Sequence, residues 1–327
     1  MKAIVLGATG FIGSHIVRAL NGEEIDVRIL RRTTSPMLAL EGLQFEEALG
    51  DLNDPKSLKK SFQGCHILFH AAGYYPVYSW QRREQTEQAL RQMKNVLEAA
   101  ESSGIQKIIY TSSMSTIGKP GKKLADETSP YDPGRFKGLY YDIKFRMERE
   151  ALAAAKRGLP VTIVNPTGVF GDYDVKPTSG IFIVKVARRE VPVIIDAKIN
   201  AVDVRDVAVA QIAAMKLGKI GRRYLLGGHN TTVLKLAQSI ARLAGVPAPK
   251  MTIPIRLAQP AAWLSEFVGY YLFRSPRPAI PRVGLDFLKN GIHYDTTRAE
   301  TELGLKKRPL EETLKRAIEW FRKNSYC

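Results

Sequence analysis

Three glycines near the N-terminus constrain the fold of this chain more than any other feature. The apolar run 3–6 leads directly into Gly7, Gly10 and Gly13, and a helical pattern begins at Phe11. After a strand, the first glycine permits a tight turn, the second lets a phosphate group approach the backbone, and the third lets the helix pack closely. The free N–H groups at the start of the helix then attract the phosphates. This segment therefore predicts a dinucleotide site at one end of a parallel sheet.

The first half of the chain alternates short apolar runs with helical patterns. Strands are predicted at 3–6, 27–30, 67–71, 107–111 and 161–165, and helices at 11–20, 55–62 and 82–102. This alternation predicts an α/β fold with a doubly wound parallel sheet and helices on both faces. After Pro166 helical patterns dominate, at 203–216, 233–244, 255–273 and 310–323. We therefore expect a cofactor-binding domain at residues 1–166 and a smaller, mostly helical substrate-binding cap at 167–327, partly interleaved with the first.

Two arginines, Arg31 and Arg32, follow the second predicted strand. An acidic residue at this place would bind the adenosine ribose of NAD, and Asp26 lies too early in the strand to do so. Guanidinium groups here can instead pair with a 2′-phosphate through charge-assisted hydrogen bonds. The sequence therefore favours NADP(H) over NAD(H), and two solvated arginines with a weak or mixed cofactor preference are the alternative. Asp51, after a further strand candidate between 27–30 and 67–71, is placed to accept a hydrogen bond from the adenine amino group.

Tyr140 and Lys144 lie one turn apart in a predicted helix and share one face. A tyrosine alone is a poor acid–base catalyst near neutral pH. A neighbouring ammonium group and an oxidised nicotinamide both favour the phenolate, so we expect Lys144 and the cofactor to lower the pKa of Tyr140. Ser113, after the predicted strand 107–111, would hydrogen-bond to the substrate oxygen. Tyr141 is the competing tyrosine, but Phe145 rather than a lysine lies four residues beyond it. Together the serine, tyrosine and lysine supply what hydride transfer at a carbon–oxygen bond requires.

The motifs GATGFIG, GDL, HAAG, YTSSMSTIG, YYDIK and NPTGVFG occur in this order along the chain. In this arrangement the sequence resembles the extended branch of the short-chain dehydrogenase/reductase superfamily, the NAD-dependent epimerase/dehydratase proteins. Segments 174–178, 220–228 and 294–304 look most similar to its dihydroflavonol 4-reductase-like and hopanoid-associated sugar epimerase group. The resemblance implies a Rossmann-type fold and a catalytic set of Ser113, Tyr140 and Lys144, with Tyr140 as the acid/base. The residues expected to contact the cofactor are Gly7, Thr9, Gly10, Phe11, Ile12, Gly13, Arg31, Arg32, Asp51, Leu52, Ala71, Ala72, Gly73, Thr111, Tyr140, Lys144, Asn165, Pro166 and Thr167.

One position departs from the family pattern. The family usually carries an asparagine early in the long fourth helix, where it is thought to support the active-site lysine, and the matching residue here is Ala89. The threonine of the same motif is replaced by Met93. Gln88 or Gln92 are the candidates for taking over the support of Lys144.

Aromatic residues follow several of the predicted strands and suggest the character of the substrate. Tyr74 and Tyr78 lie in an aromatic loop, Tyr173 follows the predicted strand 161–165, and the helical pattern 255–273 is rich in aromatic side chains. With Ser113, these three tyrosines are the candidate substrate residues, and they favour a lipophilic or cyclic substrate. Packing of the cap on the core is the alternative explanation of the aromatic residues. The pattern 255–273, flanked by Arg256, Arg274, Arg277 and Arg282, also resembles an interfacial membrane anchor.

The chain is strongly basic, with 49 Lys and Arg against 32 Asp and Glu and a formal net charge of +17. Residues 1–160 carry 23 basic and 18 acidic side chains, a net of +5, whereas residues 161–327 carry 26 and 14, a net of +12. Such an excess is typical of contact with nucleic acid, an anionic membrane or an anionic ligand, or of a solubilising surface. We expect a small-molecule substrate and no nucleic acid, and peripheral contact with an anionic membrane and a homodimer stay open.

The cysteines, histidines and hydropathy argue against a disulfide-rich, metal-binding, secreted or membrane-spanning protein. Two cysteines cannot form a disulfide framework or a four-thiolate zinc site, and the five histidines show no metal-ligand spacing, so we expect no metal ion. The N-terminus lacks the pattern of a secretory signal, and no run of about 18 apolar residues occurs. We therefore expect a cytoplasmic location.

The leading hypothesis is an NADP(H)-dependent oxidoreductase that interconverts a carbonyl and a secondary alcohol on a small lipophilic or cyclic substrate. The first alternative is a nucleotide-sugar epimerase or dehydratase that recycles a bound NAD(P). The second alternative is a non-catalytic NAD(P)-sensing or RNA-binding protein of the same fold, suggested by Ala89 and by the net charge.

Overall fold

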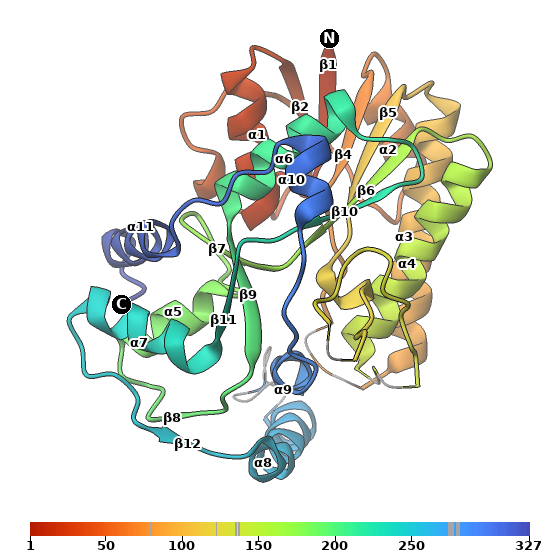
Figure 1. Ribbon diagram of the computed structural model, residues 1–327. Helices are drawn as coiled ribbons and strands as arrows, with labels where there is room; N and C mark the ends of the chain where they lie inside the picture. Colours follow the sequence, from red (N-terminus) through yellow and green to blue (C-terminus); the bar gives the residue numbers. More distant parts are fainter. Residues whose placement is uncertain are drawn as a thin grey trace.

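The computed structural model describes residues 1–76, 78, 80–121, 123–134, 136, 138–273, 278 and 282–327. Within these residues the largest sheet has seven strands in the order β10-β6-β5-β4-β1-β2-β3, and every neighbouring pair is parallel. The strands are β1 (Lys2–Leu6), β2 (Asp26–Arg31), β3 (Glu46–Leu49), β4 (Ile67–His70), β5 (Lys107–Thr111), β6 (Val161–Pro166) and β10 (Arg223–Leu226). The winding reverses between β1 and β4, where ligands bind in such sheets. Figure 1 shows this sheet between two helical layers, which confirms the predicted doubly wound α/β fold.

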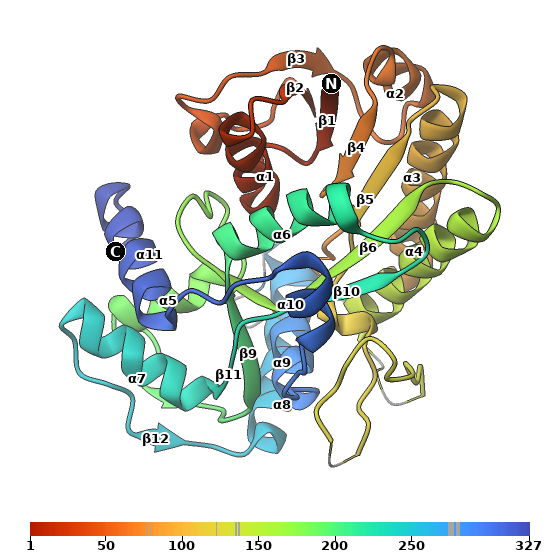
Figure 2. The ribbon, with the colours of Figure 1, turned by 45° about the horizontal axis from the view of Figure 1, so that its top comes forward.

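Alternating side chains of the strands build an apolar layer on each face of the sheet, as the period of two in a strand requires. Ala3 and Val5 of β1 enter the layer that contains α1, α6 and α10, whereas Ile4 and Leu6 enter the layer that contains α2, α3 and α4. The helices are α1 (Phe11–Gly22), α2 (Pro55–Phe62), α3 (Arg82–Ser102), α4 (Leu139–Lys156), α6 (Val204–Leu217) and α10 (Thr297–Leu303). Figure 2 shows α3 and α4 together on one side and α1 and α6 on the other. The candidate site lies at the carboxyl ends of the strands of this sheet.

The rest of the second half forms a smaller unit around a three-stranded sheet in the order β11-β9-β7. Its elements are β7 (Gly168–Phe170), α5 (Gly180–Ala187), β9 (Lys198–Asp203), β11 (His229–Thr232), α7 (Val233–Ala244) and α11 (Leu310–Lys323). Side chains of the three helices share a third apolar cluster with this sheet. Two short strands, β8 (Val193–Ile194) and β12 (Met251–Thr252), pair beside it. Because β10, α6 and α10 belong to the large sheet and its layers, the chain crosses between the two units more than once.

The predicted helical pattern 255–273 forms α8 (Ile255–Phe267) and a π-helical turn, η3 (Val268–Leu272), followed after a break by α9 (Arg282–Lys289). Short 3-10 turns, η1 (Leu38–Leu40) and η2 (Met114–Thr116), complete the described elements. Arg274 and Arg277, named above, lie outside the described residues. Among the helices that the structure describes, none combines the length and apolarity needed to cross a bilayer.

Candidate active site

The glycine loop between β1 and α1 has no room for side chains. Gly7 has a φ of +79°, and a Cβ atom there would lie 2.7 Å from the backbone nitrogen of Ala72. A Cβ atom at Gly13 would overlap the carbonyl oxygen of Gly7. Gly10 begins α1 without a side-chain cap, and the first turn of α1 is partly exposed at Phe11. Its free N–H groups can therefore receive a pyrophosphate, and the loop fits a dinucleotide.

Small residues continue this surface at the end of β4. Ala71 donates its backbone N–H to the carbonyl oxygen of Leu6 at 3.0 Å, which holds the end of β4 against the end of β1. A Cβ atom at Gly73 would lie 3.0 Å from the Nζ atom of Lys144. The glycine therefore lets the Lys144 side chain approach the backbone beside the predicted cofactor site.

Arg31 and Arg32 differ in their surroundings at the end of β2. The Nη2 atom of Arg31 donates to Oε1 of Glu47 on β3 at 2.8 Å, whereas Arg32 is exposed. The pairing between β2 and β3 brings Glu47 to this place, and the sequence analysis did not identify it. Of the two arginines, Arg32 has the guanidinium group that faces solvent.

Asp51 and Leu52 form the loop that follows β3. Oδ1 of Asp51 accepts from the backbone N–H and the side-chain amide of Asn53, each at 2.8 Å. The carbonyl oxygen of Leu52 accepts from Nδ2 of Asn95 on α3 at 2.9 Å. These bonds hold the loop that would face the adenine ring.

Tyr140, Lys144 and Ser113 come together at the start of α4 and the end of β5. The Nζ atom of Lys144 lies 6.0 Å from the ring centroid of Tyr140. Burial raises the pKa of Tyr140, and a hydrogen bond with Ser113 lowers it in part. Burial lowers the pKa of Lys144 to about 8, against the attraction of Glu148, which raises it. The expected lowering of the Tyr140 pKa by Lys144 is therefore wrong for this structure, because the loss of water around the hydroxyl dominates.

A buried carboxylate, Glu148, holds α4 against the end of β6. Its Oε2 atom accepts from Oγ1 of Thr116 at 2.8 Å and from Nδ2 of Asn165 at 2.6 Å. Its Oε1 atom accepts from Nη1 of Arg223 on β10 at 3.0 Å. Nδ2 of Asn165 also donates to the carbonyl oxygen of Ser113 at 3.1 Å. This network positions the serine loop relative to α4. The sequence analysis missed Glu148, although it stands one turn beyond Lys144.

His70 ends β4 inside the protein beside this network. Its ring lies 5.3 Å from that of Tyr110, and neither ring nitrogen has a hydrogen-bond partner among the described residues. Burial and, less strongly, the charge of Lys144 lower the pKa of His70 to about 3. His70 is therefore neutral near physiological pH and adds no second positive charge beside Lys144.

Comparison with known families gives a match over residues 3–227 to the description "NAD dependent epimerase/dehydratase family". The chain belongs to this family. It is 35% identical to a putative dihydroflavonol 4-reductase of Synechocystis sp., over 98% of this chain and 95% of that protein. It is 31% identical to sterol demethylase protein B of Methylococcus capsulatus, over 98% of each chain.

A solved structure from Pseudomonas aeruginosa, described as a nucleoside-diphosphate-sugar epimerase, superposes with a TM-score of 0.85 and 28% identity over 100% of this chain and 99% of the other. These matches confirm the resemblance that the motifs indicated. As a member of the epimerase/dehydratase family with reductases and dehydrogenases among its relatives, the protein is an NAD(P)-dependent oxidoreductase of the extended short-chain dehydrogenase/reductase type.

Ala89, the departure from the family pattern, is buried in the apolar layer around α3 and α4. Oε1 of Gln88 accepts from the hydroxyl of Tyr74 at 3.4 Å, and Nε2 of Gln92 donates to Asn53 at 3.3 Å. Among the described residues neither glutamine contacts Lys144 by a hydrogen bond. The described charged neighbour that favours the ammonium form of Lys144 is Glu148.

Aromatic side chains surround Tyr140 on the substrate side. The ring of Tyr75 lies 5.1 Å from that of Tyr140, and the ring of Phe287 on α9 lies 5.2 Å from it. Tyr78, predicted to contact substrate, packs at 5.3 Å from Tyr270 of η3. Phe287 was missed because nothing in the sequence indicates that α9 returns to α4.

Tyr173 lies elsewhere, between α1 and α11. The guanidinium carbon of Arg18 lies 3.7 Å from its ring centroid, and the rings of His15 and Trp320 lie 5.9 Å and 5.6 Å away. No described ring contact joins Tyr173 to Tyr140. The structure therefore places this predicted substrate residue beside α1 and α11 rather than beside Tyr140.

The predicted cofactor residues at the ends of β5 and β6 use their hydroxyl groups inside the protein. Oγ1 of Thr111 donates to Gln211 on α6 at 2.8 Å, and Oγ1 of Thr167 donates to Asn200 on β9 at 2.7 Å. Pro166 is the last residue of β6 and directly precedes Thr167. These bonds fix the strand ends over which a nicotinamide would lie.

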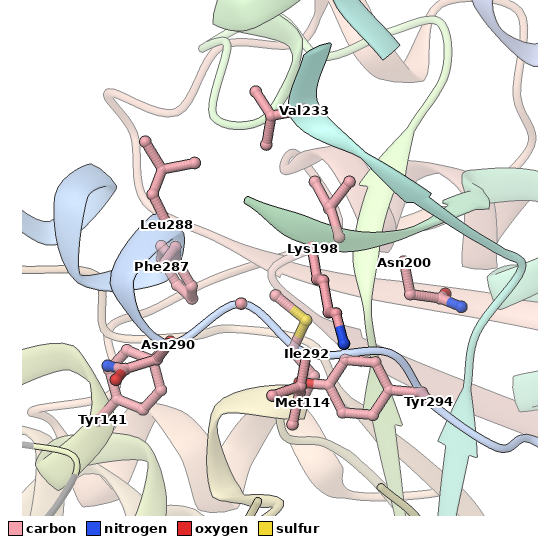
Figure 3. A pocket seen from close by; sticks show the side chains of 12 residues that line it. Met114, Tyr141, Lys198, Asn200, Val233, Phe287, Leu288, Asn290, Ile292 and Tyr294 are labelled. Carbon is pink, nitrogen blue, oxygen red and sulfur yellow. The ribbon is translucent and has the colours of Figure 1, made fainter. Parts of the chain in front are cut away.

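A small cavity of about 50 Å³ lies next to this site. Met114 and Tyr141, the neighbours of Ser113 and Tyr140 in the sequence, line it together with Phe287 and residues of β9 and the segment 290–294. In Figure 3 the side chain of Lys198 extends from β9 toward Tyr294. The cavity therefore lies between the start of α4 and the second unit of the chain.

Proposed function

We propose that this protein is an NADP(H)-dependent oxidoreductase that interconverts a carbonyl group and a secondary alcohol on a small lipophilic or cyclic substrate, with Tyr140 as the acid/base. The observation that carries the proposal is the convergence of Tyr140, Lys144 and Ser113 beside a glycine loop that fits a dinucleotide. Tyr140 is the reactive group because its hydroxyl is hydrogen-bonded to Ser113 and it shares a helix face with Lys144.

A bound nicotinamide supplies or accepts the hydride. The residues of this chain move and hold the proton. Because burial raises the pKa of Tyr140, its hydroxyl is protonated near neutral pH and is ready to donate a proton to a carbonyl oxygen. Ser113 donates a hydrogen bond to the same oxygen. Lys144, with a pKa of about 8, is mainly charged near neutral pH and stabilises the phenolate that forms.

The glycine loop, the ends of β4, β5 and β6, and Asp51 with Leu52 form the proposed cofactor site. Arg32, exposed at the end of β2, is the group that we assign to a 2′-phosphate. Arg31 can bind the phosphate only if it gives up its ion pair with Glu47. An arginine that already pairs with a carboxylate contributes less to a second anion. NADP(H) is therefore favoured over NAD(H) mainly through Arg32.

The substrate class follows from the side chains around Tyr140. Tyr75 and Phe287 flank the catalytic ring, and Tyr74 and Tyr78 belong to the same aromatic loop. Aromatic walls with few polar groups suit an apolar ring system. The two relatives at 35% and 31% identity are named for a dihydroflavonol and for a sterol, which are both polycyclic molecules.

A spectrophotometric screen tests this proposal. Purified protein is incubated with NADPH or NADH and with cyclic ketones, acyclic ketones and aldehydes, and oxidation of the cofactor is recorded. The proposal expects turnover with a cyclic or lipophilic ketone and a higher kcat/KM with NADPH. A screen in which no cyclic or lipophilic ketone turns over, or in which NADH is preferred, contradicts it.

The second candidate is a nucleotide-sugar epimerase or dehydratase with a recycled cofactor. The similarity to the epimerase from Pseudomonas aeruginosa favours it. The two functions differ in cofactor demand, because an epimerase returns the hydride to the product and needs no added cofactor. Turnover of a nucleotide-sugar by protein that carries its own NAD(P) favours the epimerase.

We also propose that residues 1–166 bind the cofactor and residues 167–327 form the substrate cap. The glycine loop and Tyr140 belong to the first segment, and Phe287 reaches Tyr140 from the second. A covalently trapped lipophilic ketone that labels α9 supports this division, and labelling restricted to the first segment opposes it.

A further inference from the structure

The segment α8–η3 exposes large apolar side chains and buries a charged one, which is the reverse of an ordinary surface helix. Ala262 and Glu266 are 0% exposed, whereas Leu272 is 67% and Phe273 is 77% exposed. A surface helix in water normally buries its large apolar residues and exposes its charged ones. The exposed apolar residues, which we call the α8–η3 face, are Leu257, Trp263, Leu264, Phe267, Tyr271, Leu272 and Phe273. Figure 1 shows α8 at the bottom of the molecule, away from the central sheet.

Three aromatic residues form one stripe along this face. The rings of Trp263 and Phe267 lie 5.5 Å apart, and those of Phe267 and Tyr271 lie 5.1 Å apart, each pair separated by one helical turn. Exposed single apolar residues are ordinary, but a contiguous exposed patch marks an interaction surface. The stripe is therefore an interaction surface for a partner into which aromatic and leucine side chains can insert.

The inner side of α8 holds it on the fold, and Tyr271 of the α8–η3 face also contacts Trp80. On the inner side, Oε1 of Glu266 accepts the backbone N–H of Arg282 at 2.9 Å, and the buried small residue Ala262 allows close packing. α8 packs on α9 through this inner side. The large exposed side chains thus remain available to a partner outside the chain.

The charge around the face is positive. Between residues 250 and 273 the exposed charged side chains are Lys250 and Arg256, and the acid of the stretch, Glu266, is buried. In the sequence, three further arginines and no acid stand between Phe273 and Val283, and the whole chain carries a net charge of +17. Basic residues beside exposed Trp, Phe and Leu are the composition of an element that lies in the surface of an anionic bilayer.

The face is continuous with the surroundings of Tyr140. The ring of Tyr271 lies 5.9 Å from that of Trp80, and Tyr270 lies 5.3 Å from Tyr78 in the loop that also contains Tyr75. Tyr75 in turn contacts Tyr140. A molecule leaving a bilayer at α8 would therefore meet aromatic side chains of the loop that also contacts Tyr140.

We propose that the α8–η3 face docks the protein on the surface of an anionic membrane, with the aromatic stripe in the interface and the mouth of the active site toward the lipid. The contact is peripheral, since α8 lies along the surface. Membrane binding is measured without substrate or cofactor, so its failure and the failure of the proposed reaction are distinguishable.

Flotation of the full-length protein with phosphatidylglycerol–phosphatidylcholine vesicles tests this proposal. We expect binding at low salt, weaker binding with phosphatidylcholine alone, and release at high salt, where screening shortens the range of charge attraction. Leu272→Asp should lower the partition coefficient at least about tenfold, since it removes one leucine from the interface and adds a repelled charge. Arg256→Glu should weaken binding to anionic vesicles only.

Leu217→Asp on α6 is the matched control, because Leu217 is 62% exposed on an element that both ribbon views place away from α8. It should bind vesicles like the unchanged protein. Sedimentation velocity without lipid identifies the alternative occupant, a second copy of the chain. Equal binding by the Leu272→Asp and Leu217→Asp proteins, no binding at low salt, or a dimer that only Leu272→Asp dissociates would overturn the proposal.

Discussion

The ammonium nitrogen of Lys144 lies 6.0 Å from the ring centroid of Tyr140, one turn along α4. Burial acts on the two groups in opposite directions, raising the pKa of Tyr140 and lowering that of Lys144 to about 8. Near neutral pH the pair therefore consists of a neutral phenol beside a mainly charged ammonium group. This state favours donation of a proton by Tyr140, as carbonyl reduction requires.

The rate of reduction should depend on the charge of Lys144. That charge is lost as pH rises through about 8, so kcat for ketone reduction should fall over the same range. Glu148 raises the pKa of Lys144, and Glu148→Gln should move the fall in kcat to lower pH. Asp206→Asn, which changes a carboxylate that pairs with Arg308, is the control and should leave the pH profile unchanged. A profile that Glu148→Gln does not move contradicts the coupling.

Two buried histidines should make the protein sensitive to acid. Burial lowers the pKa of His70 to about 3 and that of His15 to about 4, from 6.5 in the unfolded chain. Below pH 6.5 the unfolded state therefore binds protons that the folded state does not, and the free energy of unfolding falls by about 1.4 kcal/mol per pH unit for each histidine. Urea unfolding between pH 6.5 and pH 4.5 measures this slope. His70→Leu should remove about half of it, and an unchanged slope in the His70→Leu protein would contradict this explanation.

Cofactor preference should depend more on Arg32 than on Arg31. Arg32→Ala should weaken NADPH binding by roughly ten- to a hundredfold, the value of a charge-assisted contact, and leave NADH binding unchanged. Arg31→Ala should have a smaller effect because Arg31 already pairs with Glu47. Fluorescence titration of both cofactors measures the constants, with exposed Arg83→Ala as the control. Equal losses for NADH and NADPH in the Arg32→Ala protein would remove the 2′-phosphate assignment.

Gly73 should be required for the position of Lys144. A Cβ atom at residue 73 would lie 3.0 Å from Nζ of Lys144, so Gly73→Ala must displace the ammonium group. We expect kcat to fall roughly tenfold, since catalysis is sensitive to sub-ångström displacement, with a smaller change in stability. Gly22→Ala is the control, because a Cβ atom there meets nothing within 4 Å. Unchanged kcat in Gly73→Ala would show that Lys144 is free to move without loss.

The parts of the fold that depend on local pattern were predictable from the sequence. The helices Pro55–Phe62, Arg82–Ser102 and Leu310–Lys323 begin and end where their periodicity predicts, and β5 is Lys107–Thr111 as expected. The three-stranded sheet β11-β9-β7 was not predicted. Its strands are short and pair across long separations, as in His229 with Ala201, so no local signal marks them.

In the candidate site, too, residues related by local spacing were predictable, whereas contacts between residues far apart in the sequence were not. Tyr140 and Lys144 are related by one helical turn and are visible in the sequence. The partners of Glu148 come from η2, β6 and β10, which only the folded chain brings together. The pKa of Tyr140 was predicted in the wrong direction because burial, which dominates it, depends on that tertiary environment.

The central claim is that Tyr140 transfers the proton in a nicotinamide-dependent carbonyl reduction, and Tyr140→Phe tests it most directly. Its kcat is compared with that of Tyr141→Phe, the adjacent control on the same helix, while NADPH affinity is measured for both. The account predicts a loss of about 10²- to 10⁴-fold in kcat for Tyr140→Phe alone, with cofactor affinity nearly unchanged. Full activity in Tyr140→Phe, or an equal loss in Tyr141→Phe, would contradict it.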